Sequence, residues 1–111
     1  MEIQASDPIV VLMTAASVEE ATKIAEVLVN SKLAACVQVL PEIQSIYFWK
    51  GEVEREREVL MIAKTISAKF EVFQNQVRAI HSYETPEIIA LPVVAGSPDY
   101  LKWLTSSLEG S

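Results

Sequence analysis

A tight turn at Lys50-Gly51, with a long extended segment on each side, restricts the fold of this chain more than any other feature. Gly51 supplies the positive φ that a two-residue hairpin turn needs. An apolar segment at residues 33–49 precedes the turn, and the segment from Glu52 to Thr65 follows it. The pattern predicts a long antiparallel hairpin, in which Pro41 marks an edge strand or a bulge.

The returning segment of this hairpin carries alternating charges. By the two-residue period of a strand, one face holds only acidic side chains, at Glu52, Glu54, Glu56 and Glu58. The other face holds Val53, Arg55, Arg57 and Val59. Exposed charges on a strand more often form a surface ion-pair ladder than a catalytic carboxylate pair. We therefore expect ion pairs here and assign no chemistry to the row.

The chain before the hairpin has the pattern of one strand and one helix. Residues 9–13 are a short apolar run, typical of a covered strand. Ser17 followed by Glu20 is a capping box. The apolar stripe behind it predicts a helix that ends near Lys32.

The chain after the hairpin repeats this order. Ser67 is expected to cap a second helix, whose apolar positions are Phe70, Phe73, Val77 and Ile80. Residues 88–94 form the last predicted strand, and Pro92 again indicates an edge. Ser97 followed by Pro98 predicts the start of a short C-terminal helix.

This order of elements predicts an α+β fold. It is a ferredoxin-like βαββαβ sandwich with an elongated hairpin between its second and third strands and a short C-terminal helix. The second and fourth strands of that fold lie at the sheet edges, and they are the strands that carry Pro41 and Pro92. We expect one domain over residues 1–111, with an ordered core at about 8–106.

The hairpin is too long for this fold. A helix of about 14 residues is about 21 Å long, whereas a strand from 34 to 49 reaches about 53 Å. More than half of the ribbon therefore overhangs the helices, and it carries a run of large apolar side chains, Ile46, Tyr47, Phe48 and Trp49. Because an isolated ribbon is marginal in water, we expect another subunit to cover it by strand pairing.

Composition excludes several classes of partner. The chain has 9 basic and 15 acidic residues, a net charge of -6 that repels nucleic acids and anionic membranes. Its single cysteine, Cys36, excludes an intrachain disulfide and a cysteine-based zinc site. No apolar run reaches the roughly 18 residues of a membrane span. We expect a cytoplasmic protein without a nucleic-acid or membrane partner.

The stretch from His81 to Ile88 lies between a predicted helix and a predicted strand. It holds the only histidine of the chain, two carboxylates, a phenol and a proline. Such junctions often build sites, and Pro86 stiffens this one by favouring an extended Thr85. The alternative is structural: His81 interacts with the last carbonyls of the helix while Glu84 and Glu87 face water.

Five motifs of the chain, from about Ile9 to Leu104, resemble the CutA family of divalent-cation tolerance proteins. They are Lys32 to Cys36, Ser45 to Gly51, Lys64-Thr65, His81 to Ile88, and Tyr100 to Leu104. The resemblance implies a ferredoxin-like fold, a homotrimer through the long hairpin strands, a cytoplasmic location, and a link to tolerance of copper and other divalent cations.

Copper ligation is the sharpest activity that the resemblance implies. Some members have a cysteine where this chain has Met13 and a second histidine where it has Ile80, so only His81 matches. The predicted metal site is His81 with Glu84, Glu87 and Met13, and it binds Cu(II) or another divalent cation weakly, with no obligatory cofactor. Met13 has the alternative role of a core residue in a strand.

A second hypothesis is a signalling or ligand-binding module, since trimeric PII signalling proteins are similar in architecture. The predicted inter-subunit cleft is lined by Tyr47, Trp49, Lys64, Tyr83 and Glu87. With only three glycines the chain lacks a phosphate-binding loop, so a small organic anion fits this cleft better than a nucleotide. No nucleophile motif is present, and we predict that the protein is not an enzyme.

Overall fold

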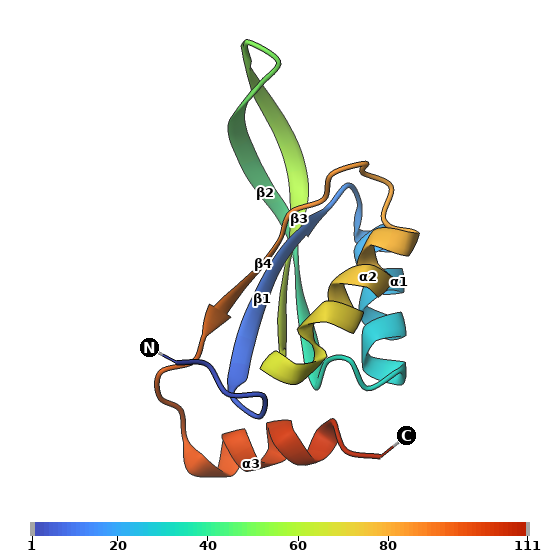
Figure 1. Ribbon diagram of the computed structural model, residues 1–111. Coiled ribbons are helices and arrows are strands. Elements are labelled where there is room, and N and C mark those ends of the chain that lie inside the picture. Colours follow the sequence, from blue (N-terminus) through green and yellow to red (C-terminus); the bar gives the residue numbers. More distant parts are fainter. Residues whose placement is uncertain (1, 111) are drawn as a thin grey trace.

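The computed structural model describes residues 2–110, and it has one four-stranded sheet packed against helices (Figure 1). The elements in chain order are β1 (Pro8–Ala15), α1 (Val18–Asn30), β2 (Cys36–Trp49), β3 (Glu52–Ile66), the 3-10 turn η1 (Ser67–Lys69), α2 (Phe70–Ile80), β4 (Ile88–Pro92) and α3 (Pro98–Ser107). The order confirms the predicted ferredoxin-like α+β fold with its C-terminal helix. Met1 and Ser111, which the predicted domain of 1–111 includes, lie outside the described residues.

The sheet has the strand order β2-β3-β1-β4, and each neighbouring pair is antiparallel. The edge strands are therefore β2 and β4, as the two prolines predict. Pro41 lies where the register of β2 shifts between Leu40 and Ile43. Strand β4 ends at Pro92, two residues earlier than the predicted 88–94, because its partner β1 begins at Pro8, whose carbonyl accepts the last hydrogen bond, from the Val93 amide.

The turn between β2 and β3 has the predicted geometry. Lys50 has φ 50° and Gly51 has φ 85°, and Trp49 pairs with Glu52 across the turn. Positive φ at both central residues is the requirement of a type I′ turn, whose twist matches that of paired strands.

The core lies between one face of the sheet and helices α1 and α2, which cover that face alone (Figure 1). The two central strands supply Val11, Met13, Met61 and Ala63, and the helices supply Ile24, Leu28, Phe73 and Val77. Alternate residues of the same strands point to the opposite face, which none of the helices within residues 2–110 covers. Large apolar side chains on that face, such as Leu40, Ile89 and Leu91, stay exposed.

Of the three predicted helix starts, the one at Ser97-Pro98 is confirmed, and the other two differ in outcome. The Ser17 hydroxyl accepts a hydrogen bond from the Glu20 amide at 3.1 Å, so the first cap is confirmed. Ser67 instead begins η1, its side chain forms no cap, and α2 starts at Phe70. The Ser67 amide donates a hydrogen bond to the Asp7 carbonyl, which connects the start of η1 to the N-terminal segment. The chain forms a tight 3-10 turn here before α2 begins.

Helix α3 packs across the end of the sheet that lies farthest from the hairpin turn (Figure 1). Leu104 and Leu108 form a second small core with Ala35 and Ile66. Within residues 2–110, no helix has the length and apolar character needed to cross a membrane.

The hairpin extends beyond the rest of the molecule (Figure 1). Strand β1 pairs only with Val59–Ile66 of β3, so residues 52–58 and their partners in β2 have no third strand beside them. We call residues 43–58 the overhang. Phe48 at its tip is 71% exposed, which agrees with the predicted mismatch between the hairpin and its helices.

Replacing Gly51 by Val should lower the free energy of unfolding by about 1–2 kcal/mol, because a β-branched residue resists positive φ. The added Cβ meets no atom within 4 Å, so the cost is conformational only. Thermal unfolding measures the effect. Lys50→Asn is the matched control, since asparagine tolerates this conformation, and a melting temperature that is unchanged in Gly51→Val would contradict the turn.

Candidate functional site

The loop of residues 81–87 joins α2 to β4 and contains the candidate site. Helix α2 ends at Ile80, and His81 is its C-cap with extended backbone angles, φ -79° and ψ 142°. The apolar stripe of α2 fixes this position, because Phe73 and Val77 anchor the helix in the core. The histidine therefore enters the loop at a defined point next to the end of β1.

The His81 imidazole is enclosed and bonded at both nitrogens. Nε2 lies 2.7 Å from the Thr14 carbonyl oxygen at the end of β1. Nδ1 accepts a hydrogen bond from the Tyr83 amide at 3.0 Å. The side chain is only 1% exposed. The ring thus connects the sheet to the loop, a role beyond the predicted contact with the helix carbonyls.

The Tyr83 phenol continues this network to the hairpin. Its hydroxyl donates to a carboxylate oxygen of Glu58 at 2.9 Å, and Glu58 is buried at the root of the overhang. Burial, together with this hydrogen bond and the negative charge of the nearby carboxylates, raises the pKa of Tyr83 far above its ordinary value. The phenol therefore stays protonated, and it remains a donor, over the whole physiological range of pH.

Glu20 joins the loop to the start of α1. Its two carboxylate oxygens accept hydrogen bonds from the amides of Ala16 (3.0 Å) and Ser82 (2.7 Å). Burial alone raises the pKa of Glu20, but these hydrogen bonds bring it below its ordinary value. The predicted capping box is therefore half observed, since Glu20 reaches Ala16 and Ser82 rather than the amide of Ser17.

The structure does not assemble the four residues of the predicted metal site into one ligand set. Met13 has no exposed surface and packs in the core, and the ring nitrogens of His81 are both engaged. Glu84 and Glu87 are exposed. Within residues 2–110, no three side chains of His, Cys, Asp or Glu converge as metal ligands. In this conformation the donors do not fit a tightly bound copper ion.

The residues of the predicted anion cleft are also spread over the chain. Tyr47 and Trp49 lie on the overhang, and Lys64 lies far down β3, where its ammonium group donates to the Gln38 side chain. Tyr47 pairs with Glu54, ten residues from Lys64, which is about 33 Å along a strand. Tyr83 and Glu87 lie in the loop. A cleft with all five residues cannot form within one chain.

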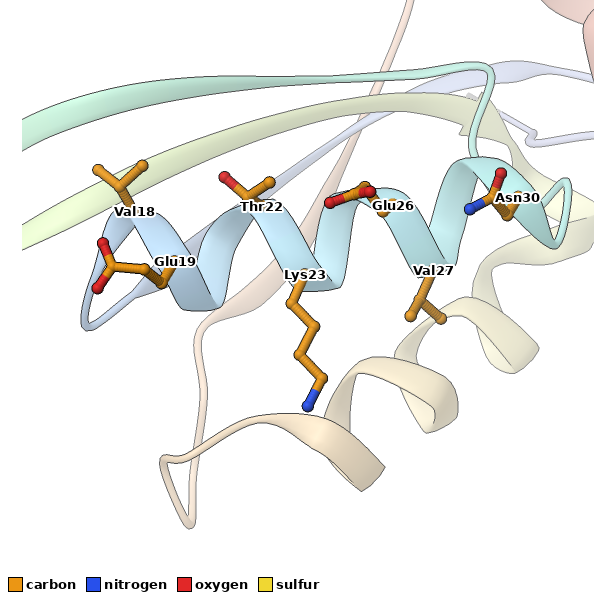
Figure 2. Close-up of a pocket in the computed structure, with 7 residues that line it drawn as sticks. All are labelled: Val18, Glu19, Thr22, Lys23, Glu26, Val27 and Asn30. Carbon is orange, nitrogen blue, oxygen red and sulfur yellow. The ribbon is translucent and has the colours of Figure 1, made fainter.

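Two concave surfaces of the chain lie elsewhere. The larger, about 510 Å³, runs along α1 and is lined by the seven side chains of Figure 2, Val18, Glu19, Thr22, Lys23, Glu26, Val27 and Asn30. A second, about 380 Å³, lies beside β4 and the start of α2 and includes Ile9, Phe70 and Leu91. None of the predicted site residues lines either of them.

Sequence reasoning missed three members of the observed network: Thr14, Glu20 and Glu58. The two-residue period places Glu58 on one face with Glu52, Glu54 and Glu56, and so predicts an ion-pair ladder that includes it. Within the described residues, the only Lys or Arg salt bridge joins Arg57 to Glu42 of β2, with an N to O distance of 3.4 Å, so the ladder is absent. A signal for Glu58 was its place next to Val59, where the exposed ribbon enters the core.

Comparisons with known proteins identify the relatives of the chain. Residues 9–107 match the family model described as CutA1 divalent ion tolerance protein. The Divalent-cation tolerance protein CutA of Thermus thermophilus is 46% identical over 95 residues, which are 86% of this chain and 92% of the relative. The chloroplastic Protein CutA of Arabidopsis thaliana is 44% identical over 89% of this chain, which spans only 54% of that relative.

A solved structure has the same fold. The periplasmic divalent cation tolerance protein CutA of Archaeoglobus fulgidus superposes with a TM-score of 0.89 at 41% identity, over 92% of this chain and 99% of the other. None of these three relatives is named as an enzyme or as a PII signalling protein. Periplasmic and chloroplastic relatives contradict the predicted cytoplasmic location. That prediction depended on composition and on the family resemblance.

Replacing Tyr83 by Phe should lower the free energy of unfolding by about 1–3 kcal/mol at pH 7, because it leaves a buried carboxylate without its donor. Since the pKa of Tyr83 is raised in the folded state, this contribution is complete below about pH 10, the unfolded value, and is lost as the pH rises further. Urea unfolding of parent and variant between pH 7 and 11 measures the difference.

The matched control for Tyr83→Phe is Tyr100→Phe, which removes a hydroxyl from an exposed tyrosine of α3, away from the overhang. Its effect at pH 7 should be small, because exposed groups exchange a protein partner for water. A loss of stability in Tyr83→Phe that is the same at every pH would contradict the proposed pairing of phenol and carboxylate.

Proposed function

The chain belongs to the CutA1 divalent ion tolerance protein family, and from this membership we propose that it contributes to tolerance of divalent metal ions, copper included, as a homotrimer. The family match over residues 9–107 supports the tolerance role. The apolar surface that a single chain leaves uncovered supports the assembly.

That uncovered surface is the observation that carries the proposal. Helices cover one face of the sheet, while Leu40, Ile89 and Leu91 are exposed on the other. The overhang adds further exposed apolar side chains, at Ile46, Phe48, Trp49 and Val53. Patches of this kind mark interaction surfaces, and a two-stranded ribbon alone is marginal in water.

The geometry of the sheet supports a ring of identical chains. Its two edges differ, since β2 has 14 residues and β4 has 5. If β2 of one copy pairs with β4 of the next, the contact is head-to-tail, and such contacts build a closed ring when the rotation between neighbours closes. Three copies is the number that the family resemblance implies. In this arrangement each overhang lies against a neighbouring subunit.

The metal part of the proposal is modest. Glu84 and Glu87 offer exposed carboxylates, whereas Met13 and His81 are enclosed. Carboxylate oxygens bind divalent cations, but two of them without an imidazole make a weak site for Cu(II). We therefore propose weak binding of divalent cations at the surface, with no resident metal required for folding. No specific contact favours the small-anion alternative, and we do not propose it.

Replacing Val53 by Lys should dissociate the trimer, because it places a charge in a surface that assembly buries. Val53 lies on the overhang and is 56% exposed in the single chain. Val72→Lys is the matched control: it is the same substitution at a residue with 58% exposure, on the outer side of α2. Sedimentation equilibrium should show trimer for the parent and for Val72→Lys, and smaller species for Val53→Lys.

The same two variants test the function. In bacterial cells that lack their own protein of this family, the parent and Val72→Lys should restore growth at raised copper concentration, and Val53→Lys should restore it less. A parent that sediments as a folded monomer would contradict the assembly. Growth that the parent does not improve would contradict the tolerance role.

A further inference from the structure

The environment of His81 leads to an inference about a single chain, and it depends on neither the trimer nor the tolerance role. The ring lies between the end of β1, the start of α1 and the loop, and its side chain is 1% exposed. Its partners are main-chain groups, so their hydrogen-bonding character is fixed. They therefore determine which nitrogen carries the proton.

The Thr14 carbonyl can only accept a hydrogen bond, so Nε2, at 2.7 Å from its oxygen, must carry the hydrogen. The Tyr83 amide can only donate, so Nδ1, at 3.0 Å from its nitrogen, must carry the lone pair. The ring is therefore the neutral Nε2–H tautomer. The Tyr83 ring packs against it, with centroids 4.8 Å apart.

No neighbouring charged group replaces the hydrogen-bond partner of either ring nitrogen. Glu20 is the nearest carboxylate, with Oε2 3.9 Å from Nδ1, but that oxygen already accepts the Ser82 amide at 2.7 Å. A metal ion binds a neutral imidazole through its unprotonated nitrogen. Here the lone pair of that nitrogen already accepts the hydrogen bond from the Tyr83 amide. Metal ligation would break this bond and force an enclosed ring to the surface.

We propose that His81 is a positioning residue and not a metal ligand: its imidazole fastens the loop to the end of β1 and so holds the Tyr83 phenol on the Glu58 carboxylate. The chain of contacts runs from Thr14 through the ring to the Tyr83 amide, and from the Tyr83 hydroxyl to Glu58. In this way one histidine connects the body of the sheet to the root of the overhang.

Nitrogen-15 NMR of the imidazole tests the proposal directly in the intact protein. At neutral pH the spectrum should show a protonated Nε2 and an unprotonated, hydrogen-bonded Nδ1. Addition of up to one equivalent of Zn(II) per chain should leave both signals and the Tyr83 amide signal in place. A shift of either imidazole nitrogen on addition of Zn(II), or the opposite tautomer in its absence, would overturn the proposal.

Two substitutions separate the two hydrogen bonds of the ring. In His81→Asn, the side-chain oxygen of the introduced asparagine can take the place of Nδ1 and accept from the Tyr83 amide. In His81→Gln, the side-chain nitrogen of the introduced glutamine can take the place of Nε2 and donate to Thr14. Hydrogen exchange of the Tyr83 amide should therefore be about tenfold faster in His81→Gln than in the parent, and close to the parent rate in His81→Asn.

Calorimetric titration with Cu(II) completes the test with the same two variants. Both should bind Cu(II) with the dissociation constant of the parent, to within about twofold, since no ligand is lost. A loss of about tenfold or more in both variants, with the fold intact, would identify His81 as a ligand and overturn the proposal. Equal exchange rates of the Tyr83 amide in all three proteins would also overturn it.

Discussion

The helices of this chain are shorter than the β2–β3 hairpin of the sheet on which they pack. The rest of the molecule depends on this mismatch in length. Helices α1 and α2 bury one face of the central strands, and only the Val59–Ile66 part of β3 pairs with β1. Beyond that point the ribbon has neither a third strand nor a helix. Its apolar side chains, Phe48 and Val53 among them, remain at the surface. Burying them would require other chains, and this is the physical basis of the assembly that we propose.

The polar network of the 81–87 loop lies at the root of this ribbon. Glu58 is the point where β3 changes from a core strand into the overhang, and Tyr83 satisfies its buried carboxylate. His81 in turn holds Tyr83 against the end of β1. A buried charge without a partner is costly, so this chain of hydrogen bonds stabilises the direction in which the ribbon leaves the body. In the proposed assembly, the loop would hold in place the ribbon that contacts the neighbouring chain.

Local patterns in the sequence predicted most of the fold and only part of the site. Gly51, Pro41 and the Ser17 cap act through their own backbone chemistry, so their effects could be read without the tertiary structure. The sequence pattern does not distinguish Glu58 from the other acidic residues of the ribbon, because the two-residue period of a strand predicts a face but not the depth of burial. The hydrogen bonds of His81 involve a carbonyl 67 residues away in sequence, which no local pattern reports.

The central claim is that the overhang is a covered part of the assembly, and residue-level hydrogen exchange of the unmodified protein tests it most directly. In an isolated ribbon, the outward amides of residues 43–49 and 52–58 have no partner and exchange freely. The present account predicts that these amides are protected nearly as well as those of β1, and that protection falls when the protein is diluted to the point of dissociation. Free exchange of these amides at concentrations where the protein is trimeric would contradict it.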